Sequence, residues 1–409
     1  MVSQVPQPRD RALLRKMSRR MIVDLVQRSG PVSRATIARS TNMAKPTVSA
    51  IVEELATEGI LTELGVGEAS PSGGRRPVLY EFNQASHHVV GIHIGVETTT
   101  AVLADARGSE VARTDVVTSR EAPADVLASL CGAIDRMIYE RDLAKCDVTA
   151  IGVCVPALID PLGGLLVFAP NLEWRNVNIV EGLREVNAEA TIYVHNVAQA
   201  VLAAEYMEGI GQRWPNAVLL YEDNGVGAAI MIDGSIFHGV RGFAGEIGHC
   251  KLPGGEEPCN CGAKGCLETR VSVTAMLRRV GHEPDRHSTL HQQLRTLARS
   301  DDPRVKRALR EVGKDLGLAT SWLVNLVNPD AVVIGGGFLD AGEALLDGLM
   351  ASVRDQGLPE STAALTVQRS VLGSAAPVRG ATLLALQASR RSLQRVLGGY
   401  RAPSLPFAQ

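Results

Sequence analysis

The sequence lacks a hydrophobic run long enough to cross a membrane. None of its apolar stretches approaches the roughly 18 to 20 residues that a bilayer requires, which excludes a transmembrane protein. The first twenty residues are charged and contain no apolar stretch followed by small residues, so we expect no secretory signal and a cytoplasmic location. Only seven cysteines occur in 409 residues, too few for a disulfide scaffold.

The chain also lacks a large net charge, but its value of −2 conceals an uneven distribution. Residues 1–52 hold ten Lys/Arg and two Asp, a local charge of +8. Residues 53–82 add two Arg and six Glu, which leaves +4 for the first 82 residues and −6 for the rest. A basic head on an acidic body suggests that the head meets a polyanion. At about 100 to 200 residues per domain, the length predicts roughly two to four domains.

The basic head has the pattern of a helix-turn-helix unit. Ser33 can cap a short helix, and Pro46 suits the first turn of the next helix because its missing N–H costs nothing there. Before them, spacings of three and four predict a helix over residues 11–27. The apolar positions of that helix are Leu13, Leu14, Met17, Met21, Ile22, Leu25 and Val26. Helix, tight turn and helix at this size predict a helix-turn-helix.

The segments after the third helix extend this pattern to a winged helix. Residues 60–64 and 78–82 alternate like two strands around a Gly/Ser-rich tip, and arginines beside glycines can enter a narrow minor groove. The polar start of the third helix is expected to reach the major groove. The residues expected to contact DNA are Arg34, Lys45, Pro46, Thr47, Ser49, Arg75 and Arg76. Alternatively, small three-helix units also serve as dimerisation or adaptor modules.

From His88 onward, short apolar strands alternate with helical stretches. Strands are expected at residues 89–95, 100–105, 111–115, 149–156, 217–221 and 331–334, and a helix at about 122–140. This alternation predicts an α/β fold with a mainly parallel sheet.

A group of metal-ligating residues gives the strongest local signal. His249 is followed by Cys259, Cys261 and Cys266, and the glycines between them let the chain fold back. A Cys₃His set predicts tetrahedral zinc, and four protein ligands leave no open position, so the zinc is expected to be structural. The alternative is a reduced cysteine cluster without a metal.

These motifs resemble the ROK family of sugar kinases and transcriptional repressors, in particular its repressor branch, over nearly the whole chain. The likeness rests on Glu246-x-Gly-His249, on the cysteine motif that ends at Glu268, on the winged helix ahead of them and on segments 156–160, 171–174 and 328–329. It implies a winged helix-turn-helix DNA-binding domain followed by a two-lobed α/β body with the actin-like sugar-kinase fold. The expected units are a DNA-binding domain at 1–82, a first lobe at 88–195 completed by a C-terminal helix at about 382–397, and a second lobe at 196–378.

The resemblance also implies a sugar site. Glu246, His249 and Glu268 would contact sugar hydroxyls, with His249 binding zinc through its other ring nitrogen, and Asn171 and Asn196 match two further sugar-contacting positions. The residue chemistry fits, because carboxylates and amides form hydrogen bonds in fixed directions and zinc ligation would fix the tautomer of His249. Glu246 and Glu268 could instead be acids of the surface or the zinc loop.

The residues that the family's kinases need are replaced. Phosphoryl transfer needs a base at the sugar hydroxyl and groups that hold magnesium and phosphates. Val197 stands at the position of the catalytic Asp, and residues 93–97 and 223–227 depart from the two phosphate-loop motifs. We therefore predict that the chain is not an enzyme. Loss of the Asp charge, with a His195 that can become cationic, would also reduce repulsion of a sugar phosphate, although Val197 could simply fill space.

We interpret the chain as a DNA-binding transcriptional regulator of carbohydrate genes, a repressor that binds double-stranded operator DNA as a homodimer or homotetramer. Its effector would be a sugar or sugar phosphate, which changes how the two lobes close. Two alternatives stay open. One is a bifunctional ATP-dependent sugar kinase that also binds DNA, and the other is a regulator controlled by a protein partner.

Overall fold

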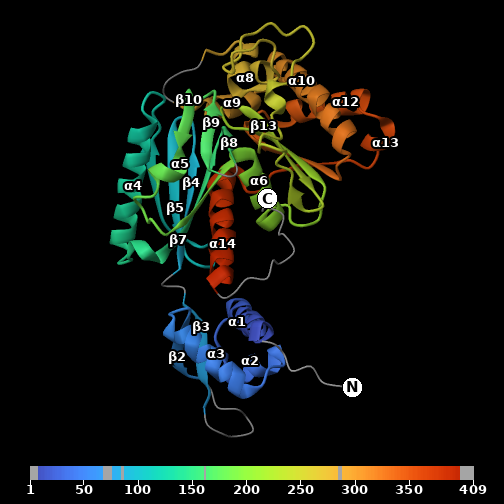
Figure 1. The fold of residues 1–409 in the computed structure, drawn as a ribbon. Coiled ribbons are helices and arrows are strands. Elements are labelled where there is room, and N and C mark those ends of the chain that lie inside the picture. The colour runs from blue at the N-terminus through green and yellow to red at the C-terminus, as the bar shows by residue number, and fades with distance from the viewer. Residues whose placement is uncertain (1–7, 68–75, 84–86, 161–162, 284–287, 397–409) are drawn as a thin grey trace.

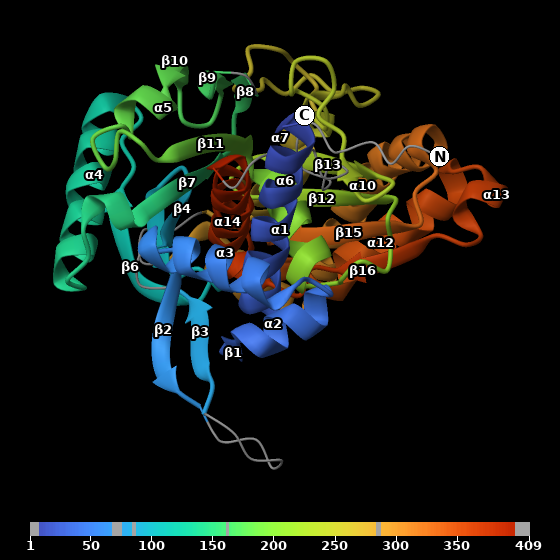
Figure 2. The same cartoon turned by 60° about the horizontal axis from the view of Figure 1, so that its bottom comes forward.

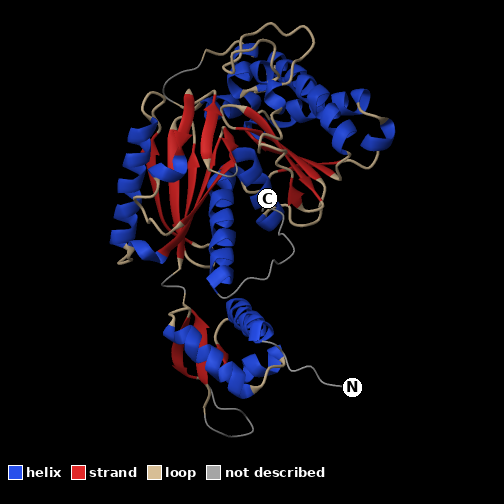
Figure 3. Cartoon of the chain, viewed as in Figure 1, coloured by secondary structure: helices blue, strands red, loops and turns tan. Residues whose placement is uncertain are grey.

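The computed structural model describes residues 8–67, 76–83, 87–160, 163–283 and 288–396. A small N-terminal unit lies at one end of a larger body that contains two separate five-stranded sheets (Figures 1 and 3). Among the helices of these residues, none combines the length and the apolar character that a membrane span needs.

The N-terminal unit consists of three helices and a three-stranded antiparallel sheet, whose hairpin projects away from the body (Figure 2). The elements are α1 (Pro8–Ser29), β1 (Val32–Ser33), α2 (Arg34–Thr41), α3 (Lys45–Thr57), β2 (Leu61–Val66) and β3 (Val78–Phe82). Ser33 caps α2 by accepting the Thr36 N–H, and Asn42 ends that helix in the left-handed conformation. Pro46 lies in the first turn of α3 as predicted. Ile37, Ile51 and Leu55 are fully buried in one core with residues of α1 and β3.

The apolar face predicted for α1 is only partly correct. Ile22 and Val26 are buried in the core, but Leu14, Met17 and Met21 expose 56%, 42% and 46% of their surface. The rest of the unit packs against the face of α1 that carries Ile22 and Val26, so spacing alone did not identify which apolar residues are covered.

The first sheet of the body has the order β11-β7-β4-β5-β6. Its strands are β4 (His88–Ile94), β5 (Thr98–Ala104), β6 (Glu110–Val117), β7 (Val148–Val155) and β11 (Thr191–Asn196). Alternate residues of β4 face opposite sides, so that Val90 and Ile92 share a core with α4 (Pro123–Glu140) and Val89 shares another with α14 (Ala376–Val396). A small antiparallel sheet and short helices complete this part, namely η1 (Lys145–Asp147), β8 (Leu158–Asp160), β9 (Leu165–Ala169), β10 (Trp174–Asn178) and α5 (Ile179–Gly182).

The second sheet has the order β14-β13-β12-β15-β16. Its strands are β12 (Ala217–Glu222), β13 (Val226–Ile232), β14 (Ser235–Ile236), β15 (Ala331–Gly336) and β16 (Thr366–Arg369). The helices that follow or cover these strands are η2 (Ile247–His249), α7 (Glu268–Val271), α8 (Val273–Arg279), α9 (Leu290–Ala298), α10 (Pro303–Val327), α11 (Gly337–Asp340), α12 (Gly342–Gln356), α13 (Pro359–Thr362) and η3 (Gly373–Ala375).

The two sheets repeat one topology. In each, the first three strands in chain order form an antiparallel meander. The fourth strand then pairs in parallel with the first, and the fifth pairs in parallel with the fourth. The prediction of a mainly parallel sheet was therefore wrong, because half of the strand pairs in each sheet are antiparallel. Short connections permit antiparallel neighbours, whereas the parallel pairs are reached through helices or longer segments.

Two helices join the lobes. Helix α6 (Val197–Glu208) leads from the first sheet to the second, and α14 returns from the second sheet to the first, where it packs on β4, β7 and α6. Glycines allow this close packing, since a Cβ at Gly152 would lie 2.1 Å from the Ala381 carbonyl oxygen and one at Gly380 only 2.2 Å from that of Ala200. The predicted C-terminal helix thus exists, but it begins at Ala376.

Buried polar contacts hold the joint between these helices. The carboxyl group of Glu205 in α6, fully buried, accepts hydrogen bonds from the Ser370 hydroxyl and from the backbone N–H groups of Val371 and Leu372. At the end of α6, Glu208 pairs with Arg379 of α14.

Arg379 also donates to the carbonyl of Gly108, in the turn between β5 and β6. From that turn, Ala106 packs against the core of the N-terminal unit. A chain of direct contacts therefore leads from α6 to the N-terminal unit.

Candidate functional site

A cavity of about 310 Å³ lies between the two lobes. Its walls include all five side chains that were predicted to bind a sugar, namely Asn171, Asn196, Glu246, His249 and Glu268. The first lobe supplies the two asparagines, from the β9–β10 turn and the end of β11, and the second lobe supplies the two glutamates and the histidine. Residues far apart in the sequence are thus brought to one place.

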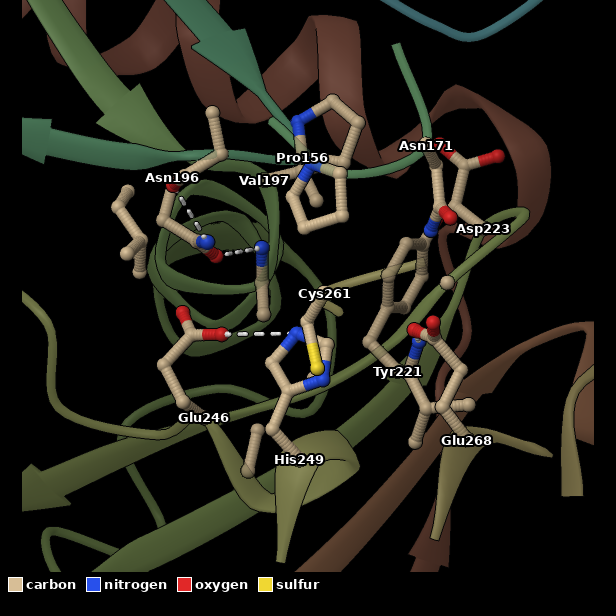
Figure 4. Close-up of a pocket in the computed structure, with 18 of the residues that line it drawn as sticks. Pro156, Asn171, Asn196, Val197, Tyr221, Asp223, Glu246, His249, Cys261 and Glu268 are labelled. Carbon is tan, nitrogen blue, oxygen red and sulfur yellow. Dashed lines mark hydrogen bonds and ion pairs between the residues drawn. The ribbon is translucent and has the colours of Figure 1, made fainter. Parts of the chain in front are cut away.

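Glu246, His249 and Glu268 form one side of the cavity (Figure 4). The Nε2 atom of His249 lies 4.0 Å from a carboxyl oxygen of Glu246. Burial, and to a lesser extent the charge of Glu268, raise the pKa of Glu246 to about 7. Glu268 is 8% exposed and accepts the backbone N–H of Val226 at 2.8 Å, which fixes its direction. Glu268 is therefore a buried acid, whereas Glu246 is partly buried and exposes 33% of its side chain.

The two asparagines already have partners within the protein. Asn196 accepts the Ala198 N–H at 2.8 Å, which caps α6, and donates to the Ala157 carbonyl at 3.1 Å. Asn171 accepts a hydrogen bond of 2.8 Å from Asn260. Gly225 allows Asn171 to approach, because a Cβ there would lie 2.5 Å from the Asn171 amide nitrogen.

The four predicted metal ligands also meet. The ligand atoms of His249, Cys259, Cys261 and Cys266 all lie within 4.8 Å of one another, so the cluster could hold a metal ion. The Nδ1 atom of His249 faces the cysteines, 3.7 Å from the Cys259 sulfur, whereas Nε2 faces Glu246 and the cavity. One ring therefore belongs to both the metal cluster and the cavity wall.

Two segments compared above with kinase phosphate loops, 93–97 and 223–227, meet across the lobes through His93 and Asp223. His93 is the next-to-last residue of β4, Asp223 directly follows β12, and their Nε2 and Oδ2 atoms lie 3.0 Å apart. Burial opposes ionisation of Asp223, but the neighbouring His93 outweighs it and lowers the pKa of Asp223. Val197 lines the cavity, and its aliphatic side chain cannot accept a proton.

The sequence interpretation missed several residues of this site. Asp223 both lines the cavity and contacts the opposite lobe, and Asn260 links the cysteine loop to Asn171. The only sequence signals were that Asp223 begins the glycine-containing segment 223–227 and that Asn260 lies between two predicted metal ligands. The apolar wall was not predicted either, and it includes Phe168, Tyr221 and Phe243. The expectation of a cationic His195 was wrong, since burial and His238 lower its pKa to about 4.

The predicted DNA-contacting residues that the structure describes lie at the start of α2, in the first turns of α3 and just before β3. Lys45, Pro46 and Thr47 are exposed in the first turn of α3, and Ser49 is half-buried. The Arg34 guanidinium lies over the Tyr80 ring, 5.0 Å from its centroid. Arg76 is exposed near the start of β3, and Arg75 lies outside the described residues.

Not all of the basic charge in this unit is available to a partner. Arg15 of α1 pairs with Glu54, and Arg19 pairs with both Glu54 and Glu58. These acids lie toward the far end of α3 from Lys45, so the uncompensated positive charge lies toward the beginning of α3.

Comparisons with known proteins agree with this architecture. The chain is 27% identical over 378 residues to a xylose repressor of Bacillus spizizenii, covering 92% of this chain and 97% of that one. A solved ROK family transcriptional regulator, a homolog of the E. coli MLC protein, has a TM-score of 0.74 at 25% identity over 94% of this chain and 98% of that one. A ROK family glucokinase from Streptomyces griseus, in complex with glucose and AMPPNP, has a TM-score of 0.63 at 25% identity over 73% and 99% of the two chains. The model of the ROK family matches residues 89–388, and the chain therefore belongs to the ROK family.

Proposed function

We propose that this protein is a DNA-binding transcriptional repressor controlled by a sugar. The observation that carries the proposal is the meeting of Asn171, Asn196, Glu246, His249 and Glu268 in one interlobe cavity. A xylose repressor that matches 92% of the chain supports it. Ligand binding between two lobes would change their closure, which gives the sugar a means to control the N-terminal unit.

Residues 1–82 would be the DNA-binding domain, with the start of α3 in the major groove and the β2–β3 hairpin as a wing. The exposure of Lys45 and Thr47 and the absence of a side-chain cap at Ala44 leave the first N–H groups of α3 open to DNA phosphates. Repressors with such heads bind paired half-sites, so we propose a homodimer or homotetramer.

The DNA-binding proposal is tested at the wing. Changing Arg75 and Arg76 together to Ala should weaken binding to DNA selected by the protein from a random library, by about tenfold, and should reduce the preference for A·T-rich flanks. Fluorescence anisotropy across a salt series measures both effects. Arg113→Ala, which removes an exposed arginine of the body paired with Glu110, is the control. Unchanged affinity of the double variant at every salt concentration would show that the wing assignment is wrong.

The metal cluster would hold one structural zinc ion per chain. Three thiols and an imidazole are the donors that zinc prefers, and their mutual distances suit a single ion. The His249 Nδ1 atom would bind it, which leaves Nε2 for the cavity. The role of zinc would be to hold the 249–268 segment in shape.

We propose that the protein does not phosphorylate its sugar. Wild type incubated with ATP, magnesium and a sugar panel should produce no ADP above a no-sugar blank, because Val197 cannot act as a base and the His93–Asp223 pair replaces phosphate-binding groups. Val197→Asp should not restore turnover, since both loops would still be altered. Sugar-dependent ADP release by wild type would instead support the bifunctional kinase, which the match to a glucokinase keeps as the second candidate.

A further inference from the structure

We infer that the effector is an uncharged sugar and that its phosphate ester is excluded. The inference rests on the proposed function, since it concerns the same interlobe cavity. The sequence left open a sugar or a sugar phosphate as the effector, and this inference selects the sugar. Its basis is the charge and the surface chemistry of the cavity wall.

The cavity presents negative groups and no compensating cation. Asp223 and Glu268 contribute carboxylates to its wall, and Glu246 adds a carboxyl group that burial leaves only partly ionised at neutral pH, with its pKa raised to about 7. None of the lining side chains in the described part of the chain belongs to a lysine or an arginine. A phosphate monoester carries close to two negative charges at neutral pH and needs cationic or N–H donors. A zinc ion with three thiolates would leave its cluster net negative and would not supply the missing charge.

Three groups that contact or adjoin wall residues, namely Arg175, His195 and His93, do not offer the cavity a free cation. The Arg175 guanidinium stacks on the ring of Phe168, 3.7 Å from the centroid, and does not itself line the cavity. His195 does not line the cavity either, and it is half-buried. His93 is already paired with Asp223 at 3.0 Å.

The N-terminus of α6 is a feature that would favour an anion. Val197 and Ala198, in its first turn, line the cavity. However, the Asn196 side chain accepts the Ala198 N–H at 2.8 Å and so occupies the position that a phosphate oxygen would take. One N–H group of this helix end is therefore already bonded within the protein.

The rest of the wall suits the body of a neutral sugar. Phe168, Tyr221 and Phe243, with Pro156 and Leu158, offer apolar surface to the C–H faces of a sugar ring. Glu246, His249 and Glu268 lie on one side, where hydroxyls can donate and accept hydrogen bonds (Figure 4). An uncharged sugar ring with hydroxyls along one edge matches a wall that is apolar in one part and forms hydrogen bonds in another.

Calorimetric titration of the full-length, zinc-containing protein tests the inference. The probes are glucose, mannose, galactose and N-acetylglucosamine, each with its 6-phosphate, and xylose with its 5-phosphate. We expect at least one neutral sugar to bind. Its phosphate should bind at least about tenfold more weakly, because the carboxylates of the cavity wall repel the phosphate group even when solvent partly screens the charges.

A matched pair of variants separates charge from shape. Val197→Lys places a cation at the start of α6, and Val197→Met adds similar length without charge. Lysine should reduce the discrimination against the phosphate at least about threefold relative to methionine, if both variants retain the melting temperature of wild type within a few degrees. Equal discrimination by the two folded variants would contradict the role of charge.

The outcomes distinguish this inference from the function on which it rests. A phosphate ester that binds as tightly as its sugar, or more tightly, overturns the inference and leaves a sugar-controlled repressor intact. Failure of every probe to bind, in protein that still binds DNA, overturns sugar control and the inference together and favours the protein-partner alternative.

Discussion

Replacement of Cys259 by Ser should remove the metal and with it the sugar response, while DNA binding persists. Cys259 is buried beside His249, and its loop carries Asn260, which donates to Asn171 of the other lobe. Loss of one ligand should release the loop and displace His249 and Glu268 together. Two lost hydrogen bonds to charged or polarised groups correspond to about 3 kcal/mol, so sugar affinity should fall about a hundredfold.

Metal analysis, calorimetry with the best neutral sugar and DNA anisotropy measure the three consequences. The expected values are one zinc per wild-type chain, less than about half of that in the variant, and unchanged DNA affinity without sugar, because the N-terminal unit has its own core. Cys250→Ser is the control, since Cys250 lies next to His249 but outside the ligand cluster. Wild-type protein that contains no zinc after purification under reducing conditions would defeat the proposal.

Glu205→Ala should produce the largest loss of stability among single changes in the interlobe joint. The mutation removes an acceptor from the Ser370 hydroxyl at 2.6 Å and from the N–H groups of Val371 and Leu372 at 3.0 Å each. Buried donors left without an acceptor cost about 1 to 3 kcal/mol each, so the free energy of unfolding should fall by at least about 3 kcal/mol. Urea denaturation monitored by circular dichroism measures the loss.

Glu208→Ala provides the comparison on the same helix. Glu208 is partly exposed and pairs with Arg379, so its removal should cost no more than about 1 kcal/mol. If the two variants were destabilised equally, the backbone hydrogen bonds of Glu205 would not be what holds the joint.

The sequence predicted the elements of the fold better than their arrangement. The sequence pattern located β4, β7 and β15 correctly, because each strand is a short apolar run bounded by turn residues. The direction of pairing is a tertiary property, and so the antiparallel meanders and the small β8–β10 sheet were not foreseen. The exposure of Met17 and Met21 was missed for the same reason, since spacing does not reveal which elements pack on a helix.

Prediction of the site succeeded where the residue types themselves are diagnostic. A histidine and three cysteines at short spacing indicate a metal cluster without any knowledge of the fold. His93 and Asp223 give no such signal, because each acquires its partner only when the two lobes meet. The same holds for Asn260 and Asn171, which are separated by 89 positions.

Helix α6 has a mechanical consequence for a single chain. Its first turn forms part of the cavity wall, and its last turn is tied through Glu208 and Arg379 to the turn that touches the N-terminal unit. Its twelve residues form a helix about 18 Å long, and a helix of this length moves as a rigid body, so a displacement of one end along the axis displaces the other end. A ligand that shifts the start of this helix would therefore move its far end, so a single chain contains a continuous mechanical connection between its cavity and its N-terminal unit.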